Sequence, residues 1–373
     1  MSKKNAAIFA AALILALAAI GYQNSGCTTV DTVSTQRGSH GYRLWSGESL
    51  VSFAHRGQAI CVPTGWQAVG QVAEDMDDGS VRFERGTTGV LIKKESFGLR
   101  ALEPRGSSYR VSVLYPLSLS RADVDTLFPI VSNAFSEVGA LYEDVVTERI
   151  PHTVLVTASV HESEAIYPDP TSRTSYMIGP VGSERGEGLL IHAVVHLYNR
   201  FSDVRPYLGK QEPFNVAEFQ ELEATWAETA LSTHPGAAFK RLMYLYRVHS
   251  AVVTQNAALV ADAPPFNDVA AFNTIRPTIL VQPGAPYLDV QYGHYVLAPL
   301  TMAAIDALLY ERGTGLSVRT ILTDLHTGKR ENFMQALKEV LSEKDRRSVN
   351  AWIVADAQIP VSLIQRAIAQ YDQ

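Results

Sequence analysis

The sequence predicts an α+β protein with an N-terminal all-β domain, a mixed catalytic-type domain and a C-terminal α-helical region. Over residues 42–117, short apolar or alternating segments lie between Gly, Pro and Asp turns, which is typical of β-strands. From Val124 to Leu141, apolar residues recur at the spacing of one helix face. The chain has 373 residues. A single hydrophobic core usually stops growing at roughly 250–300 residues, so we expect more than one packed unit.

The N-terminus has the pattern of an export signal. Lys3 and Lys4 precede an uncharged run over residues 6–20, and polar residues follow it. The run is shorter than the roughly 20 residues that span a bilayer, although the next two residues could extend it into an uncleaved anchor. We therefore predict a signal or membrane anchor over residues 1–27 and an exported protein of the cell envelope or periplasm.

The two cysteines have two competing uses. Cys27 follows a small residue in "SGCTT", which is typical of a lipidated cysteine. In an oxidising compartment a disulfide between Cys27 and Cys61 is the alternative, and the sequence leaves both open. Residues 28–41 are small and polar, so we expect them to form a tether after the signal or anchor.

The composition excludes one class of partner. Charged residues make up 19% of the chain, the formal net charge is −6, and no long basic run is present. Proteins that bind nucleic acid carry a basic patch, so we do not expect nucleic acid as a partner. The expected partners are a peptide or protein, and a membrane through the N-terminus.

The chain after the β-rich domain divides into two further parts. We expect a mixed domain over residues 118–258, and a connecting segment with C-terminal helices over residues 259–373. In the mixed domain, "HTVLVTASV" (152–160) and "SYMIGP" (175–180) are predicted strands. The glycine-rich turn "GSERGEG" then precedes an apolar helix.

That helix, "GLLIHAVVHLYNRF", places His192 and His196 four residues apart. On one helix face both imidazoles can bind the same ion, although such pairs also arise by chance. A second predicted helix, "QELEATWAETALSTH", carries Glu221, Glu223 and Glu228. We expect Glu228 to be the third ligand, and Glu221 and Glu223 to lie on an exposed face. Two imidazoles and one carboxylate favour zinc.

The stretch "HLYNRFSDVRP" (196–206) resembles the segment after the second zinc histidine in the glycyl aminopeptidase family of gluzincins. In that family His-Leu-Trp-Asn is followed by a basic segment ending in Arg-Pro. The third ligand lies roughly thirty residues further on, shortly after a tryptophan, which here would be Trp226 followed by Glu228. The resemblance covers residues 110–365 and implies a thermolysin-like mixed domain with zinc.

The stretch "QYGHYVLAPLTMAAIDALLYERGTGLSVRTILTDL" resembles the gluzincin helix pair that begins with a tyrosine bound to the transition state. This implies that Tyr292 donates a hydrogen bond to the developing oxyanion. The alternative is an ordinary half-buried tyrosine.

Two departures from the family fall on catalytic groups. Ala193 stands where the family has the glutamate that takes a proton from zinc-bound water, and such groups contribute about 10²–10⁴-fold to the rate. The family's Glu-His segment, which holds the substrate's amino end, is also absent, and Asp169 is the only nearby acid that could replace it. Glu187, in the turn before the helix, is a candidate substitute base.

Three functional hypotheses follow. The chain is an extracytoplasmic zinc metallopeptidase-like protein whose hydrolysis is impaired, or a pseudoenzyme that binds a peptide or protein. In the third, the metal is lost and His192 and His196 are core histidines bonded to Glu228. In the first two, the peptide would pair with the strand at residues 174–179.

Overall fold

The computed structural model describes residues 50–54, 59–69, 72–75, 79–83, 88–142, 150–157, 165–169, 174–178, 184–201, 216–234, 236–254, 296–354 and 359–370. The chain divides into two compact units, residues 1–97 and residues 98–373. The predicted signal or anchor, the tether, Cys27 and Tyr292 all lie outside the described residues. In the described part of the chain, no helix is long and apolar enough to span a bilayer.

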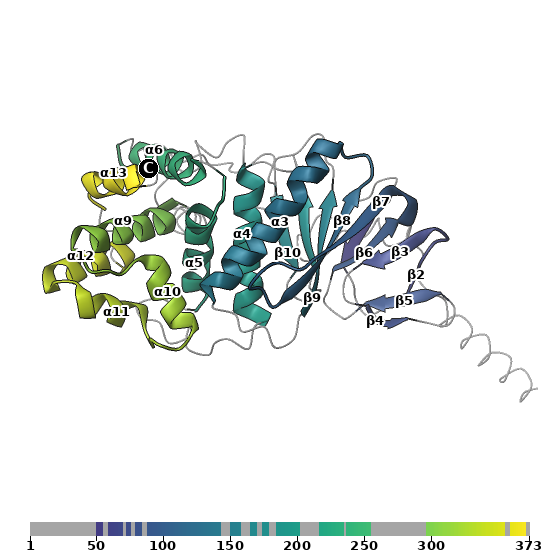
Figure 1. The fold of residues 1–373 in the computed structure, drawn as a ribbon, viewed down its shortest axis with the longest axis horizontal. Coiled ribbons are helices and arrows are strands. Elements are labelled where there is room, and N and C mark those ends of the chain that lie inside the picture. The colour runs from purple at the N-terminus through teal and green to yellow at the C-terminus, as the bar shows by residue number, and fades with distance from the viewer. Residues whose placement is uncertain are drawn as a thin grey trace, which may run out of the picture. The chain divides into compact units, whose positions relative to one another are not determined.

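Two antiparallel sheets make up the described part of the first unit (Figure 1). One has the order β1 (Leu50–Ala54), β6 (Thr88–Lys93), β3 (Trp66–Val69). The other has the order β2 (Ala59–Cys61), β5 (Ser80–Phe83), β4 (Val72–Asp75). The central strand β6 buries Val90, Leu91 and Ile92 completely, as expected for a strand with neighbours on both sides. Cys61, at the end of β2, is disulfide-bonded.

A mixed five-stranded sheet belongs to the second unit. Its order is β10 (Ala165–Asp169), β11 (Thr174–Ile178), β9 (Ile150–Thr157), β8 (Tyr109–Pro116), β7 (Phe97–Leu102). β9 runs parallel to β8 and β11, whereas β10 is antiparallel to β11. The sequence interpretation grouped β7 and β8 with the N-terminal β-rich domain. The alternating pattern identifies a strand but not the sheet in which it pairs, so it could not separate them.

The order of this sheet also changes where a peptide could pair. β11, which spans most of the strand predicted to receive a peptide, has β10 on one side and β9 on the other. Its backbone hydrogen-bonding groups are therefore already used within the sheet, and the prediction of edge pairing at residues 174–179 is wrong. Among the strands that the structure describes, the edge on this side of the sheet is β10.

Two long helices pack beside this sheet. The predicted helix over Val124–Leu141 is confirmed as part of α3 (Arg121–Leu141), which begins after Ser120, whose side chain accepts from the backbone N–H of Asp123. α4 (Glu184–Phe201) contacts α3, β10 and β11. A Cβ atom at Gly139 would lie 2.4 Å from the carbonyl oxygen of Gly106, so glycine permits α3 to approach this loop closely.

The remaining helices form a layer on the other side of α4 from the sheet (Figure 1). They are α5 (Val216–Ala230), α6 (Ala237–Thr254), α9 (Ala298–Glu311), α10 (Val318–His326), α11 (Phe333–Val340), α12 (Glu343–Val354) and α13 (Val361–Gln370). α9 is apolar on nearly all sides and contacts α5, α6, α12 and α13, so it is the central helix of the layer.

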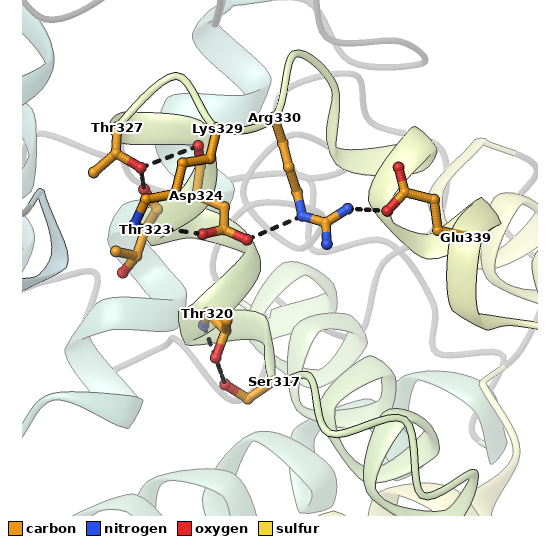
Figure 2. A network of polar contacts seen from close by, with 8 residues as sticks. All are labelled: Ser317, Thr320, Thr323, Asp324, Thr327, Lys329, Arg330 and Glu339. Atoms are coloured by element: carbon orange, nitrogen blue, oxygen red, sulfur yellow. Dashed lines mark hydrogen bonds and ion pairs between the residues drawn. The ribbon is translucent and has the colours of Figure 1, made fainter.

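Polar contacts join the C-terminal helices at their ends. Figure 2 shows Arg330 between α10 and α11, where its Nε donates to Asp324 Oδ2 at 3.0 Å and its Nη1 pairs with Glu339. The hydrogen bond with Glu339 raises the pKa of Arg330. At the start of α10, Ser317 accepts from the backbone N–H of Thr320. Each charged group of this network faces an opposite charge, which indicates a structural role.

A second arginine joins α9 to α12. Arg312 donates from Nε and Nη2 to the two carboxylate oxygens of Asp345, at 2.9 and 2.8 Å. Ser342 also donates to Asp345 at 2.8 Å. The hydrogen bond from Arg312 is the largest of the effects that lower the pKa of Asp345. The bidentate pair therefore joins the end of α9 to the first turn of α12.

A fully buried pair connects α5 to α10. Glu223 of α5 contacts Nε2 of His326 at the end of α10, and neither side chain has exposed surface. The His326 ring stacks on Tyr142, with ring centroids 3.8 Å apart. Tyr142 in turn donates to Asn199 of α4 at 2.7 Å, and Asn199 donates to the other oxygen of Glu223 at 3.4 Å. The network therefore ties α4, α5, α10 and the end of α3 together.

We predict that His326→Leu destabilises the protein by about 3–5 kcal/mol, because it removes the main partner of a buried carboxylate. The measurement is the free energy of unfolding in urea. The paired change Glu223→Met with His326→Leu is the control, and it should recover most of the loss because no buried charge then remains. A single His326→Leu variant within about 1 kcal/mol of wild type would contradict this account.

Candidate metal site

The candidate site lies where α4 packs against α5. Most of α4 is core: Leu190, Ile191, Val194 and Val195 have no exposed surface. His192 and His196 lie on the face that turns toward α5, and their side chains are 13% and 16% exposed. The i, i+4 spacing directs both imidazoles to the same side of the helix. α4 is thus a rigid element with two histidines on one partly open face.

Three side chains meet at this face. The Nε2 atoms of His192 and His196 lie 3.0 Å apart. Oε2 of Glu221 is 3.6 Å from Nε2 of His192, and Oε1 of Glu221 is 3.3 Å from Nε2 of His196. Within the described residues, His192, His196 and Glu221 are the group of side chains whose donor atoms lie close enough together to hold one metal ion.

The spacing of these atoms fits a tetrahedral zinc ion. Zinc binds histidine nitrogens and carboxylate oxygens at about 2.0–2.2 Å, so two ligand atoms at neighbouring corners of the tetrahedron are about 3.3 Å apart. The two Nε2 atoms are 3.0 Å apart and Oε1 of Glu221 is 3.3 Å from Nε2 of His196, both near this value, whereas the 3.6 Å separation from His192 belongs to the other oxygen of Glu221, Oε2. The donor set of two imidazoles and one carboxylate is also one that zinc prefers. The residues present therefore fit the metal.

Glu228 does not lie with this group. Its Oε1 is 2.7 Å from Nδ1 of His192, on the opposite side of the ring from Nε2. Only 2% of its side chain is exposed, against 26% for Glu221. An N–H on Nδ1 of His192 would face this oxygen, although the ring is not fully aligned with it. The geometry thus favours Glu221 as the third ligand and Glu228 as its neighbour behind the ring.

The two glutamates bracket His192 because of their spacing on α5. Seven residues make about two turns, so Glu221 and Glu228 share one helix face. Glu221 reaches the Nε2 side of the ring and Glu228 the Nδ1 side. The sequence interpretation placed Glu221 on an exposed face, although its seven-residue spacing from Glu228 was a signal that both face α4. Glu223, also expected to be exposed, is the buried partner of His326.

Position 193, where the family resemblance implies a general base, is buried. Ala193 is 1% exposed, and its methyl group has no atom that can accept a proton. Glu187, considered as a substitute base, is fully buried and directed elsewhere. It accepts from the hydroxyls of Ser232 and Thr233, and from the backbone N–H groups of Thr233 and His234. The structure therefore contradicts a catalytic role for Glu187, since its carboxylate fixes the turn after α5.

Two further predicted site residues cannot be placed at the metal site. Asp169 is the last residue of β10, opposite Thr174 of β11, and the position of its side chain is not described. Tyr292 lies outside the described residues. Their roles therefore stay predictions.

Comparison with known proteins supports the fold. No family model and no curated protein matches the sequence. The structure of an aminopeptidase N family protein from Idiomarina loihiensis is similar, with a TM-score of 0.56 and 11% identity over 88% of this chain. This chain covers 62% of that protein. An M1 zinc metallopeptidase from Deinococcus radiodurans aligns with a TM-score of 0.46 and 11% identity, over 87% of this chain and 74% of that one. The likeness to the first structure shows that the chain has a metallopeptidase-like fold.

We predict that the purified chain binds about one zinc ion, and that Glu221→Ala weakens binding more than Glu228→Gln does. Loss of a ligand removes a direct bond, whereas changes behind a ligand typically cost about 10–100-fold in affinity. Zinc affinity is measured by competition with a chromogenic chelator, with His196→Ala as the positive control for ligand loss. A larger effect of Glu228→Gln than of Glu221→Ala would show that Glu228 is the ligand.

Proposed function

We propose that this chain is an extracytoplasmic, zinc-binding, metallopeptidase-like protein related to the glycyl aminopeptidase family, which binds peptides and hydrolyses them poorly. The observation that carries the proposal is the meeting of His192, His196 and Glu221 at spacings that suit one zinc ion. The metallopeptidase-like fold around them supports it.

The residues of the site can perform part of the chemistry of a metallopeptidase. Zinc, when bound, supplies a Lewis acid that polarises a carbonyl or carboxylate oxygen. His192, His196 and Glu221 would hold it, and all three side chains keep some exposed surface. Three described residues near the site are not placed to perform the proton transfer: Ala193 is inert, Glu187 is directed away, and Glu228 lies between His192 and Arg241. This arrangement favours binding over hydrolysis.

The peptide would pair with β10, since this strand is the edge of the sheet and contacts α4. Pro168 limits that pairing. Proline has no N–H, and in an edge strand the proline nitrogen usually faces the unpaired side. The unpaired side of β10 therefore offers fewer backbone N–H donors to a peptide. A short extended peptide segment is therefore the ligand that suits this edge, by main-chain pairing beside the metal site.

A scaffold without metal is the second candidate function, and one observation favours it. His192 already contacts Glu228 through Nδ1, and its bare Nε2 can accept a hydrogen bond from Nε2–H of His196 at 3.0 Å. The two histidines can thus be satisfied without an ion. Zinc binding separates the two candidates, because only the first requires it.

The extracytoplasmic location rests on the N-terminal sequence, with its lysines, apolar run and polar tether. The disulfide at Cys61 supports it, because disulfides persist in oxidising compartments. An uncleaved anchor is one form of attachment to the membrane that is compatible with this disulfide; lipidation at Cys27 is the alternative, and it would exclude a disulfide between Cys27 and Cys61.

We predict that Ala193→Glu raises peptide hydrolysis by about 10²–10⁴-fold, because it restores a group that can accept the proton of water. The measurement is release of the N-terminal residue from peptide substrates by the zinc-loaded protein. Ala193→Gln is the matched control: it fills the same volume without a base and should stay as slow as wild type.

Because Ala193 is buried, the folding and zinc content of both variants need to be confirmed first. Wild-type hydrolysis as fast as that of Ala193→Glu would show that the chain has another base and is an ordinary peptidase. Zinc binding with no hydrolysis by wild type or Ala193→Glu would favour a binding role alone.

A further inference from the structure

Behind the metal-binding face, a third helix contacts the site. Arg241 of α6 forms an ion pair through Nη2 with Oε2 of Glu228, whose other oxygen contacts Nδ1 of His192. The three side chains form a chain of contacts from α6 through α5 to α4. We call this chain of contacts the Arg241–Glu228–His192 relay.

Arg241 places a positive charge beside the buried carboxylate of Glu228. The carboxylate has 2% of its side chain exposed, so water cannot solvate it. A buried carboxylate stays ionised only where an opposite charge or several donors face it. Arg241 keeps 23% of its side chain exposed and is always protonated, so it supplies a permanent positive charge at the edge of the core.

The position of Glu228 decides which nitrogen of His192 is available. With the proton of the neutral ring on Nδ1, facing Glu228, the lone pair lies on Nε2, on the side of His196 and Glu221. Metal-binding histidines usually have such a carboxylate on their second nitrogen, which fixes the ring and its tautomer. If Glu228 moved away, the proton would exchange between the two nitrogens and the ring would lose its fixed direction.

We propose that Arg241 is a positioning residue of the metal site, which holds Glu228 where it orients His192. The inference rests on the proposed function, because its main consequence is a change in zinc affinity. A purely structural role for Arg241 predicts something else: loss of the arginine would lower stability, while the folded protein would bind zinc as before.

The experiment measures zinc affinity of the full chain by competition with a chromogenic chelator, together with the melting temperature of the zinc-free protein. Arg241→Gln should lower zinc affinity by about 10–100-fold. Arg241→Lys should lower it less, because lysine keeps the charge without the planar fork, and it carries the test if Arg241→Gln does not fold. Arg312→Gln is the matched control, since it breaks a similar arginine–carboxylate pair between α9 and α12 and should leave zinc affinity unchanged.

A second readout does not depend on metal. Long-range ¹H–¹⁵N NMR of the zinc-free chain reports the tautomer of His192, which should carry its proton on Nδ1 in wild type and as a mixture in the Arg241 variants. If wild type and the Arg241 variants bind zinc equally well, the positioning role is overturned and the metal site stands. If wild type binds no zinc, the proposed metal function fails. In that case the tautomer of His192 in the zinc-free chain tests the inference. A mixture of tautomers in the Arg241 variants supports it, and the same tautomer in wild type and variants overturns it.

Discussion

The packing of α4 against α5 is the interaction on which the rest of the site depends. It places the ring of His192 between two carboxylates of one helix face, with Glu221 on the Nε2 side and Glu228 on the Nδ1 side. A rotation of either helix by one residue would turn these side chains by about 100° and separate them. The core of apolar side chains around α4 and the buried contacts of Glu223 with His326 and Asn199 hold that register.

The carboxylates around these two helices have different partners, and the difference explains which one is available to a metal. Glu187 is surrounded by hydroxyl and backbone donors, Glu223 faces His326, and Glu228 faces Arg241 and His192. Each of these three is buried and compensated within the protein. Glu221 keeps exposed surface, and its carboxylate contacts the two histidines that would bind the ion with it. Of these four acids, Glu221 is therefore the candidate ligand.

The parts of the fold that depend on local pattern were predictable from the sequence. The apolar spacing identified α3, and the pair of histidines four apart identified the face of α4. The choice of third ligand depends on how α5 turns against α4, which is a tertiary property: the short distance from Trp226 in the sequence suggests Glu228, whereas the geometry favours Glu221. Strand pairing failed for the same reason: residues 174–178 look like a strand, but only the sheet shows that β11 is internal and β10 is the edge.

The alanine at position 193 does not exclude a metal, because the three candidate ligands and their supports come from other positions. In the proposed function, this part of the fold binds a ligand without a proton-transfer group at position 193. The measurement that tests this account most directly is anomalous diffraction at the zinc edge from crystals grown with zinc. The account predicts one peak at about 2.0–2.2 Å from Nε2 of His192, Nε2 of His196 and an oxygen of Glu221. No peak between these three side chains, or a peak with Glu228 as the third ligand, would contradict it.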